Sequence, residues 1–280
     1  PLIRKGAVLT EVGWDEAIAQ TVSELRSYKK SEIAGLGSSH ATNEDNYIFQ
    51  KLMKEVIGTR NIDYVSHIKE GDEDDLLIRA DKTPNSLGCR QVGVEPAEGG
   101  LDLRGIIRGI DNGGIKVLYA LEDDLAGLPE LGAVLQKLDL LIVHSSVQNE
   151  TTAAADIVLS CSTYAEKNGT FVNFQGRIQR IRPAVATLEQ DRAKDGLSMS
   201  RWDRFASQND RWGRPLKKDA RPTWRILVSI ASALGAKWKF NLVEDVFKEI
   251  SERIPSFKGM SYLKVGTQGS MLKSEKPVHA

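Results

Sequence analysis

The chain has 280 residues and a formal net charge of zero, because 38 Lys and Arg residues balance 38 Asp and Glu residues. This balance argues against a protein that holds nucleic acid through counterion release, so we expect no nucleic-acid partner. Hydrophobic residues make up 41% and charged residues 27% of the chain, and these values exclude disordered, collagen-like and disulfide-scaffold proteins. No apolar run approaches the roughly 18 residues of a membrane-spanning helix, so we expect no direct membrane insertion.

The first third of the sequence predicts an α/β unit. Apolar residues at helical spacing predict a helix over Trp14–Lys29, and a short apolar strand follows at Ile33–Leu36. A second helix begins after Thr42, a good N-cap with Asp45 three residues on, and ends at Gly58. A strand, a Gly/Ser turn and a helix N-terminus in this order can receive an anion.

A second α/β unit begins near Gly100. Before it, Asp72–Asp75 predicts the solvated start of a helix, and Asp81–Gly88 predicts a loop. Strands then alternate with helices, which implies parallel pairing with right-handed crossovers. In chain order, the predicted elements are a helix at Leu101–Ile110, a strand at Ile115–Leu121, a helix at Leu131–Leu138 and strands at Leu140–Val143 and Ile157–Ser160.

The last part of the sequence predicts a ribbon, an irregular segment and two helices. Gly169–Ile181 predicts an extended ribbon or hairpin that Gly176 interrupts. Apolar periodicity predicts helices at Thr223–Leu234 and Leu242–Ile254. The predicted fold class is therefore α/β, with two small Rossmann-like parallel-sheet lobes and additional C-terminal helices. The expected divisions are a first lobe over 1–90, completed by helices of 219–255, a second lobe over 91–182, an irregular Arg- and Trp-rich segment over 183–218 and a flexible tail over 256–280.

Three segments in the middle of the chain share residues and spacing with a known family. Residues 155–159 are Ala-Asp-Ile-Val-Leu, residues 164–173 are Tyr-Ala-Glu-Lys-Asn-Gly-Thr-Phe-Val-Asn, and residues 176–179 are Gly-Arg-Ile-Gln. These segments strongly resemble the molybdopterin oxidoreductase superfamily, which has an Ala-Asp-Val-Val-Leu-Pro strand followed by a Glu-Lys-x-Gly-Thr-Phe-x-Asn-x-Glu-Gly-Arg-x-Gln signature. Further matches in the same order extend the resemblance over most of residues 1–182.

Two branches of this superfamily fit these motifs. One is the molybdenum- or tungsten-dependent formate dehydrogenase group, and the other is the large Fe–S subunit of NADH-quinone oxidoreductase, the respiratory complex I. The C-terminal half of this Fe–S subunit commonly has no pterin and serves as structure. The departures favour this second branch. After Asp63 a catalytic member has a segment that supplies a metal ligand, but residues 64–70 of this chain contain no Cys. Ser160 and Gln175 replace the usual Pro and Glu, and no counterpart of the C-terminal β-barrel is found.

The resemblance to the large Fe–S subunit of complex I implies a scaffold without a cofactor of its own and without catalytic residues. It would lie in the peripheral arm of the complex, on the cytoplasmic side of the inner membrane, and support electron transfer from NADH to quinone along the respiratory chain. Its partners are then other subunits of the respiratory complex. Because the sequence starts with Pro1 and not Met, we expect a piece of a longer chain whose N-terminal part holds the Fe–S clusters.

The alternative is a fragment of a molybdenum or tungsten bis-pterin formate dehydrogenase-like oxidoreductase, with molybdopterin guanine dinucleotide as its cofactor. A third class is a free-standing nucleotide-binding module. In both cases hydroxyls and helix N–H groups near the end of the first strand would bind phosphate. The same residues could instead cap helices and satisfy their free amides. The candidate cofactor-binding residues are Ser38, Ser39, Thr42, Asn43, Glu44 and Thr151.

The histidines and cysteines predict no metal site. His40, His67 and His144 are each isolated in the sequence, which is more typical of surface or packed residues than of ligands. Cys89 and Cys161 lie far apart and match no metal-ligand spacing. Cys161 follows a buried strand and is interpreted as a small core residue.

Two further groups of residues are expected to have structural or protein-binding roles and not catalytic ones. In the signature, Glu166, Lys167, Asn173 and Arg177 are expected to hold the ribbon in place. Interleaved Arg and Trp residues between 201 and 214 favour a protein–protein contact over single-stranded nucleic acid, because both types are enriched at protein interfaces and the net charge is zero. These residues are Arg201, Trp202, Arg204, Arg211, Trp212 and Arg214.

Overall fold

The computed structural model describes residues 1–185, 187–188 and 219–273, and its main feature is one seven-stranded sheet. In chain order the strands of this sheet are β1 (Leu2–Lys5), β2 (Val8–Glu11), β3 (Ile33–Ser38), β4 (Asn61–Val65), β5 (Val117–Leu121), β6 (Leu140–Ser145) and β7 (Ile157–Ser160). They lie in the order β2-β1-β7-β6-β5-β3-β4. The strands from β7 to β4 in this order are parallel, whereas β1 and β2 add an antiparallel edge.

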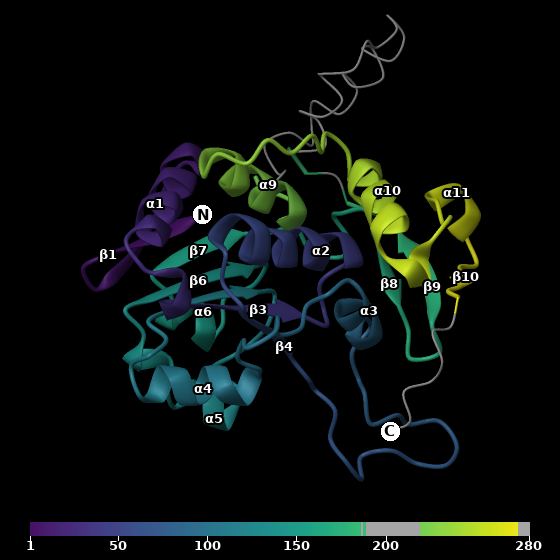
Figure 1. The fold of residues 1–280 in the computed structure, drawn as a ribbon, viewed down its shortest axis with the longest axis horizontal. Coiled ribbons are helices and arrows are strands. Elements are labelled where there is room, and N and C mark those ends of the chain that lie inside the picture. Colours follow the sequence, from purple (N-terminus) through teal and green to yellow (C-terminus); the bar gives the residue numbers. More distant parts are fainter. Residues whose placement is uncertain (186, 189–218, 274–280) are drawn as a thin grey trace, which may run out of the picture.

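Helices cover both faces of this sheet (Figure 1). In chain order they are α1 (Trp14–Arg26), α2 (Asn43–Lys51), α3 (Ser86–Gln91), α4 (Leu103–Asp111), α5 (Pro129–Gly132), α6 (Glu150–Ala154), α9 (Thr223–Ala233), α10 (Val243–Arg253) and α11 (Tyr262–Val265). One face carries α1, α2 and α9, and the other carries α4 and α5. Successive strand residues alternate between two cores: Val117 and Tyr119 lie in the first, and Leu118 and Ala120 in the second.

A second, three-stranded sheet lies beside α2 and α10 (Figure 1). It consists of β8 (Gly169–Val172), β9 (Arg177–Ile181) and β10 (Ser270–Met271), in the order β10-β9-β8 and antiparallel throughout. A Cβ atom at Gly169 would lie 2.5 Å from Thr42 Cγ2, so only glycine allows this approach of β8 to the start of α2. The ribbon of β8 and β9, which contains most of the family signature and is called the signature ribbon below, therefore packs directly on the N-terminus of α2.

The predicted α/β class, with a mostly parallel sheet and C-terminal helices, is confirmed. The two lobes expected over 1–90 and 91–182 share one sheet, however, because β3 pairs with β5 in parallel, with Ile33 opposite Val117. The crossover from β4 to β5 carries α3 and α4 and returns the chain to the other side of β3. α9 then packs against α1 and α2.

Several local predictions are wrong, each for a physical reason. Asp72–Asp75 do not start a helix, because the Asp74 carboxylate accepts hydrogen bonds from the amides of residues 76–78 and forms a turn instead. The helix expected over Leu131–Leu138 is divided into α5 and a 3-10 turn. It is divided at Gly132, where a Cβ atom would lie 2.5 Å from the Ala126 carbonyl oxygen and where glycine weakens a helix.

The C-terminal residues also differ from expectation. Residues 256–273 of the expected flexible tail include α11 and β10, because Phe257, Tyr262 and Val265 are buried in the first core. The Arg- and Trp-rich group between 201 and 214 lies outside the described residues. Over the ranges that the structure describes, the helices are too short and too polar to cross a membrane.

Candidate functional site

The order of the parallel strands reverses between β3 and β5. β4 lies on one side of β3, whereas β5, β6 and β7 extend on the other. In open α/β sheets this reversal leaves a crevice outside the carboxyl ends of the strands, and ligands bind there. A cavity of about 460 Å³ lies at this position. The residues that follow the strand ends line it, among them His40, His67, Glu122, Asp123, Asp124 and Asn149.

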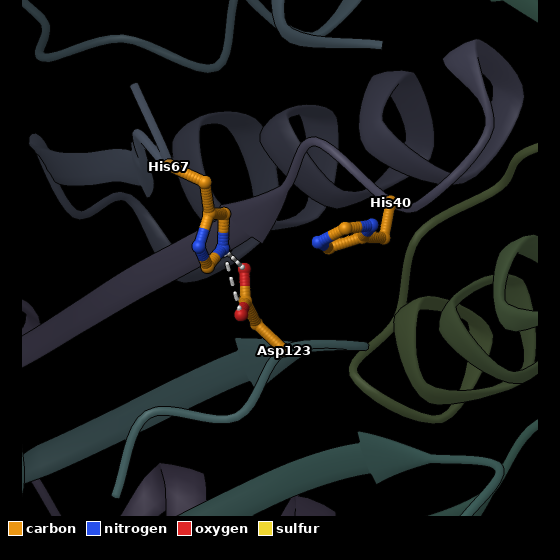
Figure 2. A group of neighbouring side chains, drawn as sticks. All are labelled: His40, His67 and Asp123. Atoms are coloured by element: carbon orange, nitrogen blue, oxygen red, sulfur yellow. Dashed lines mark hydrogen bonds and ion pairs between the residues drawn. The ribbon is translucent and has the colours of Figure 1, made fainter. Parts of the chain in front are cut away.

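Two histidines and an aspartate that line this cavity lie close together (Figure 2). His67 Nε2 lies 3.1 Å from both carboxylate oxygens of Asp123. The ring centroids of His40 and His67 are 5.2 Å apart. The Asp123 side chain is only 3% exposed and also accepts the Asp124 N–H at 2.9 Å. The three residues follow β3, β4 and β5, so the topology of the sheet brings them together.

The surroundings shift the pKa values of the two imidazoles in opposite directions. The hydrogen bond to Asp123 raises the pKa of His67 above its ordinary value, and burial opposes this effect. Burial lowers the pKa of His40, and the neighbouring His67 lowers it further, whereas Asp123 and Asp81 raise it. The arrangement therefore pairs a carboxylate with one imidazole and places a second, more readily neutral imidazole beside them.

The predicted cofactor-binding residues are buried in the protein, and only Ser38 and Thr151 bond to residues that line the cavity. Ser38, Thr42, Asn43 and Glu44 are 0% exposed, and Thr151 is 1% exposed. The Ser38 hydroxyl donates to the Glu122 carbonyl oxygen at 3.1 Å. The Thr151 hydroxyl donates to Asp124 Oδ1 at 2.6 Å and accepts the Ala126 N–H at 2.9 Å. The hydroxyls of Ser38 and Thr151 therefore have partners within the chain, whereas that of the buried Ser39 has none.

Two of these residues, Asn43 and Glu44, connect the start of α2 to the signature ribbon, and Thr42 caps the helix. Thr42 and Asp45 form the expected capping box, with the Asp45 N–H donating to Thr42 Oγ1 at 3.1 Å. Asn43 Nδ2 donates to Thr170 Oγ1 at 3.0 Å. Glu44 accepts the Thr170 N–H and the Tyr262 hydroxyl, both at 2.8 Å. Burial raises the pKa of Glu44 to about 7, although these hydrogen bonds act in the opposite direction.

A buried ion cluster joins the same elements. Lys167 Nζ lies 2.8 Å from Asp45 Oδ2 and 2.7 Å from Glu122 Oε1, and the Lys167 side chain is 1% exposed. Burial disfavours its charge, but the two carboxylates outweigh burial and raise the pKa of Lys167. The Thr223 hydroxyl donates to Glu122 at 2.6 Å, and the Trp224 N–H donates to Asp45 at 2.8 Å. The cluster thus connects α2, the end of β5, the signature ribbon and the start of α9.

Glu122 separates the cavity from this interior cluster. It has a φ of 41°, a left-handed conformation that costs a residue other than glycine about 1 kcal/mol or more. The carboxylate of Glu122 contacts Lys167, whereas the next residue, Asp123, contacts His67. The strained backbone therefore divides two neighbouring carboxylates between two sites.

The remaining candidate residues have structural positions. His144 is buried beside Tyr119, with 2.9 Å between His144 Nε2 and the Tyr119 hydroxyl, and burial lowers the pKa of His144 to about 3. Burial raises the pKa of both cysteine thiols, Cys89 and Cys161, so neither supplies a thiolate at neutral pH. Asn173 Oδ1 accepts two backbone N–H groups at the turn between β8 and β9.

Comparison with known proteins agrees with the resemblance of the sequence. Residues 92–201 match the model of the molybdopterin oxidoreductase family. Over these residues the chain is similar to that family. This segment includes β5 to β9, and so also Glu122, Asp123 and the signature ribbon.

The chain matches only a small part of the length of each of three relatives. The putative formate dehydrogenase YrhE of Bacillus subtilis is 29% identical over 167 residues, 58% of this chain and 14% of that protein. The NADPH-Fe(3+) oxidoreductase subunit alpha of Geobacter sulfurreducens is 30% identical over 184 residues, 64% of this chain and 18% of that protein. The F420-dependent formate dehydrogenase 2 subunit alpha of Methanococcus maripaludis is 30% identical over 169 residues, 58% of this chain and 21% of that protein.

The cavity does not fit the phosphates of molybdopterin guanine dinucleotide. Asp123 and Asp124 give it two consecutive carboxylates, and like charges repel. The Glu122 carboxylate is paired with Lys167. Among the described residues, neither Lys nor Arg lines it. Among the hydroxyls expected to bind phosphate, those of Ser38, Thr42 and Thr151 bond to other groups of the chain, whereas the buried Ser39 hydroxyl has no hydrogen-bond partner. We therefore assign no reaction step to this cofactor.

Proposed function

We propose that the chain forms part of the large subunit of a multi-subunit oxidoreductase related to formate dehydrogenases. The relatives support this assignment, since they are named formate dehydrogenases or the alpha subunit of an NADPH-Fe(3+) oxidoreductase. These names favour a formate dehydrogenase-like assembly over the respiratory complex I that the sequence predicts. Two relatives are named as alpha subunits, so the proposal includes partner subunits for this chain.

Within this subunit, we assign the chain the role of a structural frame. The observation that carries this assignment is the buried cluster of Lys167, Asp45 and Glu122. In this cluster the ammonium group of the signature lysine pairs with two carboxylates of the chain itself. The acidic cavity supports the same role, because it does not fit phosphates. In this proposal, the pterin and Fe–S centres of the assembly are held by other parts of the subunit or by its partners.

Purification of the native assembly through this chain tests the assignment. We expect partner subunits to co-purify, with formate-dependent reduction of an artificial electron acceptor. NADH-dependent quinone reduction without formate oxidation would instead support the assignment of the chain to complex I. If the chain purified alone and had neither activity, the proposal would be wrong.

A second candidate function is catalytic, with the cofactor held by this chain itself. It is favoured by the position of the cavity at the strand reversal, where open α/β sheets bind nucleotides. Analysis for molybdenum and tungsten, with a fluorescence assay for released pterin, separates the two candidates. We expect the 280-residue chain to carry neither metal nor pterin, and equimolar amounts of both would establish the catalytic alternative.

A further inference from the structure

We propose that His40, His67 and Asp123 bind one divalent transition-metal ion, of the class that includes Zn²⁺, Co²⁺ and Fe²⁺. One nitrogen of each histidine and one carboxylate oxygen lie within 4.8 Å of one another. Across residues 1–185, 187–188 and 219–273, these side chains are the only group of three His, Cys, Asp or Glu residues that meet in this way.

The geometry of the pair that is already in contact is close to that of a metal site. Tetrahedral Zn²⁺ has bonds of about 2.0–2.2 Å to histidine nitrogen and carboxylate oxygen, which places two ligand atoms roughly 3.4 Å apart. His67 Nε2 and the Asp123 oxygens are 3.1 Å apart. His40 is exposed, so rotation of its side chain can bring its ring nitrogen to the same spacing without repacking the core.

The donor types select the kind of ion. Two imidazoles and one carboxylate suit Zn²⁺ and the neighbouring first-row metals, whereas Mg²⁺ and Ca²⁺ prefer oxygen ligands alone. The neighbouring Asp124 also lines the cavity, and its carboxylate makes the cavity more favourable for a cation. The same charges that exclude phosphate therefore favour a metal ion.

The backbone around the three ligands is held in place. The Asp123 carboxylate accepts the Asp124 N–H at 2.9 Å, and the His40 N–H donates to the Ser38 hydroxyl at 3.1 Å. Each ligand follows the end of a different parallel strand, so the site is built on the sheet and not on one loop. All three ligands line the cavity, which leaves room for a water molecule or a small anionic ligand as the fourth ligand.

Metal titration of the chain tests the site. The apoprotein is titrated with Zn²⁺ by calorimetry and with Co²⁺ by visible spectroscopy, and Mg²⁺ serves as the oxygen-preferring comparison. We expect saturable binding of one Zn²⁺ or Co²⁺ per chain, with the d–d bands of a low-coordinate nitrogen and oxygen site, and no competition from Mg²⁺. No saturable binding of either transition metal would overturn the proposal.

Substitution of the ligands locates the ion. His40→Gln, His67→Gln and Asp123→Asn should each weaken Zn²⁺ binding by about tenfold or more, since outer-shell changes alone have effects of that size. His279→Gln, which changes the fourth histidine of the sequence, is the matched control and should bind like the wild type. His40 is exposed, so its variant remains folded even if the other two do not. Wild-type affinity in His40→Gln, or a loss in His279→Gln, would place the ion elsewhere.

Discussion

Replacement of Lys167 by methionine should be among the most destabilising single changes in the chain. The Lys167 side chain is 1% exposed, and its partners Asp45 and Glu122 are 0% and 12% exposed. Methionine has nearly the same length but no charge, so two carboxylates would stay in one interior region without a cation. Removal of one partner from a buried ion pair costs about 3–5 kcal/mol in the free energy of unfolding. We expect a loss in this range for Lys167→Met.

The measurement is urea denaturation at pH 7, followed by circular dichroism, on the wild type and two methionine variants. Lys5→Met is the matched control, because Lys5 forms an ion pair with Glu16 at 3.1 Å in which the side chains are 56% and 55% exposed. Such exposed pairs contribute about 0–1 kcal/mol. The comparison holds the substitution constant and changes only the burial of the pair.

The pH dependence provides an independent check on the cause. Burial raises the pKa of Glu122, and Lys167 opposes this effect. Without Lys167 the folded state should favour the protonated Glu122 more strongly, so Lys167→Met should regain stability relative to the wild type as the pH falls from 7 toward 5. If Lys167→Met lost no more stability than Lys5→Met, or if its loss were the same at both pH values, the cluster would not hold the ribbon to α2.

Two further predictions concern the same junction. Burial raises the pKa of Glu44 to about 7, so the folded protein keeps a proton that the unfolded chain releases near pH 4.5, and stability should fall by about 3 kcal/mol at most as the pH rises through this window. Glu44→Gln cannot ionise and should flatten the profile of urea midpoint against pH; an unchanged slope would contradict this origin. Gly169→Ala places a Cβ atom 2.5 Å from Thr42 Cγ2 and should cost about 1–3 kcal/mol. Gly13→Ala, where a Cβ meets no atom within 4 Å, should cost less than about 1 kcal/mol in the same thermal or urea melts.

Local patterns in the sequence are sufficient to predict many strands and helices of the fold. Apolar runs identify β3, β5, β6 and β7, and the capping box of Thr42 and Asp45 places the start of α2. The edge strands β1 and β2 are missed because their residues are mostly half-buried or exposed and show no apolar run. β4 is missed for a similar reason, since Asn61 and Asp63 interrupt its apolar residues.

The candidate metal site could not be predicted from the sequence, because its residues are brought together only by the order of the strands in the sheet. His67 and Asp123 are 56 residues apart and contact each other only because β4 and β5 flank β3 in the sheet. Recognition of β4 would have placed His67 two residues beyond a strand end, at the same edge as the acids that follow β5. The signal was therefore present in Glu122–Asp124, directly after a buried strand, but its partner lay beyond an unpredicted strand.

The position of the signature residues explains why the motif indicates the fold more strongly than it indicates a cofactor. Lys167 bonds to the interior carboxylates, Thr170 bonds to Asn43 and Glu44 of α2, and Asn173 closes the turn of the ribbon. Each of these contacts stabilises the junction whether or not a pterin binds nearby. Any change that freed these side chains to bind a ligand would leave buried charges or amides without partners, at a cost of several kcal/mol. The motif would therefore persist in a chain whose cavity had become suited to a cation in place of phosphates.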